Sequence, residues 1–242
     1  MQEVELDTMH DYLDLIRTNK EENIRNGNVG DFVFRGQGAD YPLIPKICRL
    51  KPKGDLFQVE RALLTEFKRT NPLLVQQQTT LNDWDYLTLG QHFGLPTRLL
   101  DWSNSALTAL WFAVSGHNTE CLPAGAYAVV WILMPTDEDF DFNPDEVHPF
   151  DLPATRIFRP RLIKQRINNQ SGVFTVPSTA ELRESRFMNE SDNYDKKLIK
   201  VKIPTSSLPN MRNDLQTLGV NAFSIFPELE GLCTFLQWRY FE

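Results

Sequence analysis

The chain has 242 residues, of which 25 are Lys or Arg and 32 are Asp or Glu, so its formal net charge is −7. A hydrophobic fraction of 41% and a charged fraction of 24% are ordinary for a folded globular protein and argue against disordered, collagen-like and coiled-coil chains. The negative charge argues against a protein whose whole surface neutralises a nucleic-acid backbone, although it is compatible with a local basic groove.

The cysteines and the apolar runs indicate in which cellular compartment the protein is expected. Cys48, Cys121 and Cys233 lie far apart and form no C-x-x-C pair, so we predict neither a disulfide framework nor a metal site. The first residues are acidic where a secretory signal carries basic ones, and the most apolar stretch, 124–134, is much shorter than a membrane span. We therefore expect a cytoplasmic protein that does not bind membranes.

The first predicted elements are a helix, a strand and a second helix. Apolar residues at helical spacing predict an N-terminal helix over 8–25, with Thr8 as its N-cap. The β-branched and aromatic run 31–35 predicts a strand that ends in a glycine turn at 36–38. One apolar face opposite charged residues predicts an amphipathic helix over 55–71.

Residues 84–114 predict a helix, a turn and a second helix. Gly94 and Pro96 interrupt the helical pattern, and the run of small and apolar residues after Trp102 is typical of a helix in the protein interior. The later predicted elements are a buried strand over 126–134, strands over 171–176, 198–203 and 220–226, and a helix over 206–218. Because strands and helices do not alternate strictly, we predict a single domain over 1–242 with an α+β fold, a mixed, mainly antiparallel sheet and flanking helices.

The densest group of chemically versatile residues lies between Gln91 and Trp102. It combines His92, which can exchange a proton near neutral pH, with Arg98, which can bind a phosphate, and with the carboxylate of Asp101. The alternative is a structural corner in which Arg98 and Asp101 form an i, i+3 ion pair and Trp102 fills the core.

Three further motifs are candidates for a site. Arg35 lies at a predicted strand end, where Gly36 would leave its side chain free to reach a ligand. Arg166 and Gln170 belong to a polar turn that leads into a strand. Glu228 and Glu230 are either an acid–base pair on an extended segment or acidic residues at a helix N-terminus, and we favour the helix N-terminus.

Several of these motifs together resemble the FRG domain family, which is named after its aromatic-Arg-Gly motif and occurs in bacterial and phage-borne proteins. The resemblance extends over about residues 30–237 and implies that one cleft gathers the motif residues. It also implies a role in bacterial or phage conflict. The motifs that carry it are Phe34-Arg35-Gly36-Gln37, Tyr41-Pro42-Leu43-Ile44-Pro45, the string from Gln91 to Trp102, Arg166, Gln170 to Phe174, and Phe226 to Leu232.

A weaker similarity links three short motifs to ADP-ribosyltransferases. Phe34-Arg35-Gly36 is similar to their first motif, Ser178-Thr179 after an aromatic strand to their Ser-Thr strand, and Glu228-Leu229-Glu230 to their Glu-x-Glu. Two prolines, Pro177 before Ser178 and Pro227 before Glu228, depart from that pattern. The similarity implies NAD as the substrate and an ADP-ribosyltransferase-like fold.

Our first hypothesis is therefore an NAD-binding enzyme that transfers or releases ADP-ribose, with a protein or nucleic acid as acceptor. The expected catalytic residues are Arg35, His92 and Glu228. The expected ligand-binding residues are Phe34, Gly36, Gln37, Thr97, Arg98, Asp101, Trp102, Arg166 and Gln170, with Trp102 or Phe34 stacking on a ring. The alternatives are a non-catalytic nucleotide sensor and a metal-independent hydrolase that uses His92 and Asp101 as acid and base.

Overall fold

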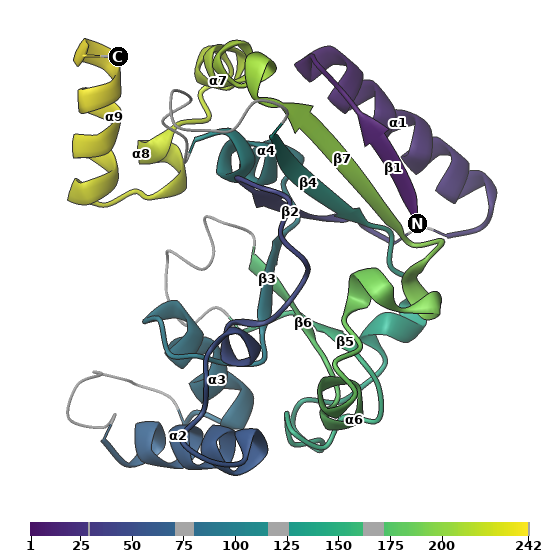
Figure 1. Cartoon of the computed structure of the whole chain (residues 1–242), viewed down its shortest axis with the longest axis vertical. Coiled ribbons are helices and arrows are strands. Elements are labelled where there is room, and N and C mark those ends of the chain that lie inside the picture. Colours follow the sequence, from purple (N-terminus) through teal and green to yellow (C-terminus); the bar gives the residue numbers. More distant parts are fainter. Residues whose placement is uncertain (29, 71–79, 116–125, 162–171, 242) are drawn as a thin grey trace.

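The computed structural model of the chain describes residues 1–28, 30–70, 80–115, 126–161 and 172–241. Among these residues, seven strands form one sheet in the order β1-β7-β4-β2-β3-β6-β5 (Figure 1). β1 and β7 are parallel, and every other neighbouring pair is antiparallel. The strands are β1 (Gln2–Glu5), β2 (Val33–Gln37), β3 (Leu100–Ser103), β4 (Tyr127–Leu133), β5 (Arg156–Phe158), β6 (Gly172–Val176) and β7 (Leu198–Pro204).

Helices flank the sheet and complete the predicted α+β fold, which the structure confirms. They are α1 (Met9–Arg25), α2 (Leu56–Thr70), α3 (Asp83–His92), α4 (Ala106–Val114), α6 (Thr179–Arg183), α7 (Leu208–Thr217), α8 (Ala222–Ile225) and α9 (Leu229–Phe241). The side chain of Thr8 caps α1 by accepting the Asp11 amide, as predicted. The predicted helices over 55–71 and 206–218, the interior helix and three of the predicted strands are also confirmed, within a few residues at their ends.

The sheet forks between β2 and β3. In the described structure these two strands pair only through Phe34 and Ser103, whereas β2 pairs with β4 along its whole length. Figure 1 shows β3, β6 and β5 turned away from the other four strands. Because strands that separate leave a gap between their facing edges, this fork provides room for a pocket inside the fold.

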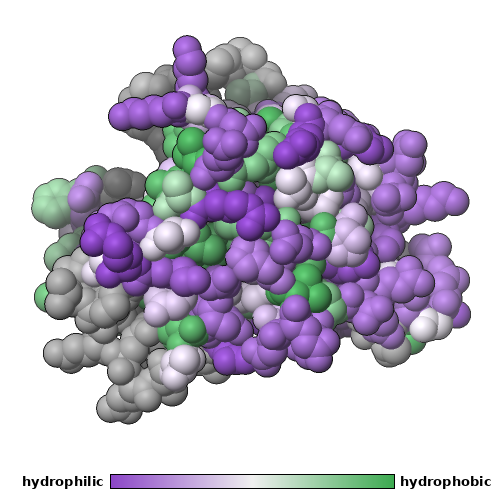
Figure 2. All heavy atoms as spheres, turned by 90° about the horizontal axis from the view of Figure 1, so that it is seen from below, coloured by the Kyte–Doolittle hydropathy of each residue, from purple (hydrophilic) through white to green (hydrophobic). Residues whose placement is uncertain are grey.

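Hydrophobic clusters cover both faces of the sheet near the fork. On one face Phe34 packs with Ala109 of α4 and Met211 of α7. On the other face Val33 packs with Trp102 and Trp131. This alternation along β2 is the two-residue period of a strand buried on both sides. The surface seen from below is mainly hydrophilic, with small hydrophobic patches between the polar groups (Figure 2).

Gly36 lies inside β2, opposite Val130. The prediction of a glycine turn at 36–38 is therefore wrong in its start, because the strand continues to Gln37. Its missing side chain serves packing. A Cβ atom at this position would lie 1.8 Å from the carbonyl oxygen of Ala109 and 2.7 Å from the amide nitrogen of Ala113. The backbones of β2 and α4 therefore approach each other more closely than any side chain at residue 36 permits.

Two further sequence-based predictions of secondary structure are wrong. Residues 100–103, expected within a helix–turn–helix, form β3, which lies between β2 and β6. Residues 222–225, expected in a strand, form α8, which the side chain of Asn221 caps. Ser178, which the similarity to ADP-ribosyltransferases matched to their Ser-Thr strand, is the N-cap of α6 and forms a capping box with Glu181.

The structure also contains β1, β5 and α6, which the sequence patterns did not predict. Within the described ranges, no helix has both the length and the apolarity that crossing a bilayer requires.

Candidate functional site

A pocket of about 390 Å³ occupies the fork between β2 and β3. Its size lies in the lower part of the range usual for small-molecule sites. We call it the fork pocket. The residues that line it are Phe34, Arg35, Gly36, Thr88, Gln91, His92, Asp101, Trp102, Ser103, Ala109, Phe112, Gly172, Phe174 and Phe226.

The walls of the fork pocket differ in chemistry. Residues of β2, β3 and β6 form its floor. From α3 come the polar side chains Thr88, Gln91 and His92, whereas α4 and the residue that follows α8 contribute the aromatic rings of Phe112 and Phe226. Figure 1 shows α3 toward the lower end of β3 and α8 beyond its upper end. The pocket lining therefore combines polar side chains from α3 with aromatic rings from α4 and from the residue after α8.

Arg35 bridges the two strands of the fork. Its Nη1 donates a hydrogen bond to the backbone carbonyl of Asp101 at 2.6 Å and lies 4.0 Å from the Asp101 carboxylate. Its side chain is 17% exposed, and its Nε has no hydrogen-bond partner within the described part of the chain. The pKa of Arg35 is lowered, mainly because the residue is buried. The Asp101 carboxylate acts in the opposite direction, and nearby Arg49 adds to the lowering. The guanidinium thus retains unused donor capacity beside the pocket.

Asp101 is held by a chain of hydrogen bonds that starts in α3. Gln91 donates from Nε2 to Asp101 Oδ2 at 2.9 Å, and its Oε1 accepts the hydroxyl of Thr97 at 2.6 Å. Thr97 in turn accepts the backbone amide of Leu99 at 3.1 Å. The Asp101 side chain remains 60% exposed, so it is oriented yet accessible. Thr97 is therefore a positioning residue that does not itself line the pocket.

Thr88 contributes a second unsatisfied polar atom. The residue is 1% exposed, and its hydroxyl has no hydrogen-bond partner among the described residues. In most proteins nearly all buried polar atoms are paired, and an exception calls for a reason. Thr88 Oγ1 and Arg35 Nε are both such exceptions, and both belong to residues that line the fork pocket.

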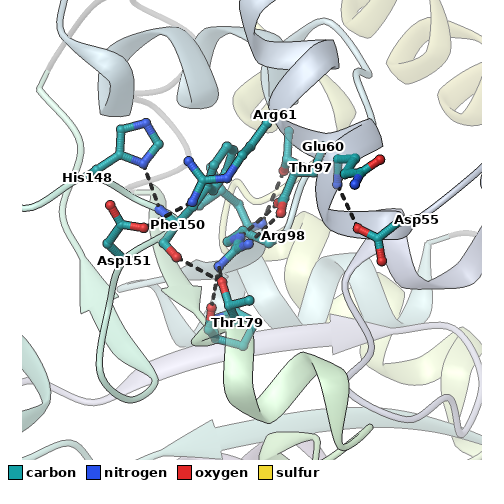
Figure 3. A network of polar contacts seen from close by, with 12 residues as sticks. Asp55, Glu60, Arg61, Thr97, Arg98, His148, Phe150, Asp151 and Thr179 are labelled. Atoms are coloured by element: carbon teal, nitrogen blue, oxygen red, sulfur yellow. Dashed lines mark hydrogen bonds and ion pairs between the residues drawn. The ribbon is translucent and has the colours of Figure 1, made fainter.

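Arg98 lies elsewhere, in a buried cluster shown in Figure 3. It is 1% exposed and forms a bidentate ion pair with Glu60 of α2. In this pair Nε donates to Oε1 at 2.8 Å and Nη2 donates to Oε2. Its Nη1 donates to the carbonyl of Pro177 and to the hydroxyl of Thr179, and Phe150 covers the guanidinium at 4.6 Å. This placement differs from both predictions, because Arg98 neither lines the pocket nor pairs with Asp101.

The two aromatic residues expected to stack on a ligand are part of the core. Phe34 is 5% and Trp102 2% exposed, so only their edges reach the pocket. Trp102 donates its indole N–H to Thr175, and Gln37 accepts the indole N–H of Trp131 at 2.7 Å. Gln37 is not among the lining residues.

The motifs that resemble ADP-ribosyltransferases do not meet in the described structure. Glu228 is exposed, directly precedes α9 and does not line the fork pocket. Its neighbour Glu230 is in the first turn of α9, as the helix interpretation predicted. Thr179 bonds to Arg98 in the buried cluster. Arg166 and Gln170 lie outside the described residues.

Eight pocket residues were not among the predicted site residues: Thr88, Gln91, Ser103, Ala109, Phe112, Gly172, Phe174 and Phe226. Thr88 and Phe112 have no signature of their own, because each lies in a helix whose other residues are mostly buried. Phe226 was noted only as part of a motif with Glu228, so its position next to α4 was not foreseen. Only the three-dimensional contact of Phe226 with Phe112, 6.0 Å between ring centroids, identifies them as one surface.

The fold and the site together define an α+β protein with a pocket of about 390 Å³ at a fork in its sheet. Residues 30–121 match the model of the FRG domain. This match supports the resemblance to that family over the segment that contains β2, α3, β3 and α4. No curated protein and no solved structure matches the chain.

Proposed function

We propose that the fork pocket binds a nucleotide, with NAD as the first candidate. The observation that carries this proposal is the pair of unsatisfied buried atoms, Arg35 Nε and Thr88 Oγ1, on residues that line one pocket. A phosphate accepts hydrogen bonds from a guanidinium fork and from a hydroxyl, and its charge offsets the cost of burying Arg35. The nearby amide of Gln91 and the ring of His92 are suited to ribose hydroxyls.

Cleavage of NAD is the reaction that we propose for this arrangement. The bond between nicotinamide and ribose C1′ would break, its electron pair leaving with nicotinamide, and positive charge would develop on the ribose. An oxygen of water or of an acceptor would then bond to C1′ and release its proton. Asp101 is the carboxylate among the described pocket-lining residues, so we assign it, in place of Glu228, the stabilisation of that charge.

The test combines calorimetry with chromatography on purified protein. We expect NAD to bind to the wild type, and the Arg35→Met variant to bind it about ten-fold or more weakly, because a hydrogen bond to a charged group is lost. We also expect nicotinamide release by the wild type and none by Asp101→Asn.

The matched control is Arg17→Met, since Arg17 is an exposed arginine on α1 that pairs with Asp14. Binding without nicotinamide release would select a non-catalytic nucleotide sensor. Equal affinity of the Arg35→Met and Arg17→Met variants for NAD would contradict the proposed site.

A metal-independent phosphodiester hydrolase is the second candidate, since His92 and Asp101 line the same pocket. For this function we expect hydrolysis of bis(p-nitrophenyl) phosphate that persists in EDTA and falls at least about 100-fold in His92→Gln, the usual contribution of a general acid or base. His10 of α1 provides the matched control, His10→Gln, which should keep wild-type activity. A wild-type protein without this activity would eliminate the candidate.

A further inference from the structure

Phe112 is the most exposed phenylalanine that lines the fork pocket, since Phe226 is of intermediate exposure. Phe112 is 36% exposed, whereas Phe34, Trp102 and Phe174 are each at most 6% exposed. A single exposed phenylalanine is unremarkable on a protein surface. Phe112, however, lines a pocket that also carries the polar side chains of Thr88, Gln91 and His92.

Neighbouring rings fix the orientation of Phe112. Trp111 meets it edge to face at a centroid distance of 5.2 Å and an interplanar angle of 79°. Phe226 meets it at 6.0 Å and 81°, and Phe226 also contacts Trp111 at 5.7 Å. Edge-to-face contacts of this kind are the favourable geometry for aromatic pairs. A ring held in this way is preorganised, so a ligand that stacks on it loses little additional side-chain entropy.

Gly36 and Ala109 join the strand of the cation to the helix of this ring. Both line the pocket, and neither carries a side chain larger than a methyl group. Gly36 follows Arg35 in β2, and Ala109 is one helical turn before Phe112 in α4, so the cation and the ring belong to two elements that are in close contact at these small residues. A ligand that spans the pocket therefore needs an anionic group at one end and a flat apolar group at the other.

We propose that Phe112, supported by Trp111 and Phe226, is the base-binding residue of the fork pocket. The nucleotide base stacks on its ring while the phosphate reaches Arg35 and Thr88. This inference rests on the proposed function and deepens it, since it identifies the ligand class as one that requires an aromatic base. Stacking tolerates any planar base, so Phe112 selects nucleotides from sugar phosphates and does not select one base from another.

The experiment compares a ligand that has a base with one that lacks it. Calorimetric titrations with AMP and with ribose 5-phosphate are carried out on the wild type and on Phe112→Ala. The matched control is Phe93→Ala, since Phe93 is a 59% exposed ring beside His92 that does not line the pocket. We expect the wild type to bind AMP more tightly than ribose 5-phosphate, and Phe112→Ala to weaken AMP binding about ten-fold while the affinity for ribose 5-phosphate stays unchanged.

The results that would contradict the proposed function differ from those that would contradict this inference alone. Wild-type protein that binds neither AMP nor NAD would overturn the proposed function and this inference with it. AMP binding that depends on Arg35 but is unchanged in Phe112→Ala would overturn this inference alone, as would an equal loss for both ligands. Phe112→Leu keeps the apolar volume without the aromatic face, so it gives the same comparison in a variant whose packing is less disturbed.

Discussion

Replacement of Gly36 by alanine is expected to unfold the protein or to lower its free energy of unfolding by at least about 3 kcal/mol. The added Cβ would lie 1.8 Å from the Ala109 carbonyl oxygen, and its other close neighbours, Ala109 C and Ala113 N, are also backbone atoms of α4. A flexible side chain could move away, but here the whole helix must shift. The measurement is urea-induced unfolding of Gly36→Ala followed by circular dichroism.

The matched control is Gly54→Ala. A Cβ atom at Gly54 would have nothing within 4 Å, so this change should alter the free energy of unfolding by less than about 0.5 kcal/mol. A Gly36→Ala variant as stable as Gly54→Ala would show that β2 and α4 are not in such close contact.

A second large loss of unfolding free energy is expected when the buried ion pair between Glu60 and Arg98 is broken. Both side chains are at most 3% exposed. We expect Arg98→Met to lower the free energy of unfolding by about 3–5 kcal/mol, because it leaves the Glu60 carboxylate buried without its cation. Glu60→Met is expected to cost less than Arg98→Met, because Arg98 keeps its bonds to Pro177 and Thr179 and its contact with Phe150.

Double-mutant analysis tests this explanation. The Glu60→Met, Arg98→Met double variant removes both charges, so its loss of unfolding free energy should be smaller than the sum of the two single losses. The exposed pair of Arg17 and Asp14 on α1 is the reference, and Asp14→Asn should change the stability by less than about 0.5 kcal/mol. Additive effects at residues 60 and 98 would contradict the pairing.

The close contact at Gly36 and the ion pair of Arg98 show that residues of one motif have different roles. Gly36 and Arg98 belong to the two motifs that carry the FRG resemblance most strongly, yet Gly36 makes room for α4 and Arg98 joins α2 to the segment before α6. Arg35, His92 and Asp101 come from the same motifs and line the fork pocket. A short motif can therefore mix residues that hold the fold with residues that line a pocket.

Local patterns were sufficient for most of the fold. Thr8 and the apolar spacing after it located α1, and the interior helix and the strands β4, β6 and β7 followed from their hydrophobic runs. The wrong prediction of a helix–turn–helix at residues 100–103 has a physical cause, since the sequence Leu-Asp-Trp-Ser is compatible with both a helix and a strand. Its strand conformation depends on hydrogen bonds to β6, which is about 70 residues away in the sequence.

The candidate site was predictable only in part. Arg35, His92 and Asp101 have side chains that carry chemistry, so residue type alone drew attention to them. Sequence spacing misplaced Arg98, because its partner Glu60 lies on a helix that no local pattern connects to it. Thr88 and Phe112 became visible only through an unpaired hydroxyl and an exposed ring in a shared pocket. Such properties belong to the folded arrangement and not to any one segment.

The fork also determines how the chain can be divided. β1, β2, β4 and β7 lie on one side of it, whereas β3, β5 and β6 lie on the other, so the backbone passes repeatedly from one half of the sheet to the other. No single cut separates the halves, and neither half can be expressed as a continuous fragment. The segment 30–121 contains both edges of the fork but lacks β4 and β6, the strands that flank them. An isolated 30–121 fragment would thus expose the unpaired edges of β2 and β3, so truncation studies require the longer chain.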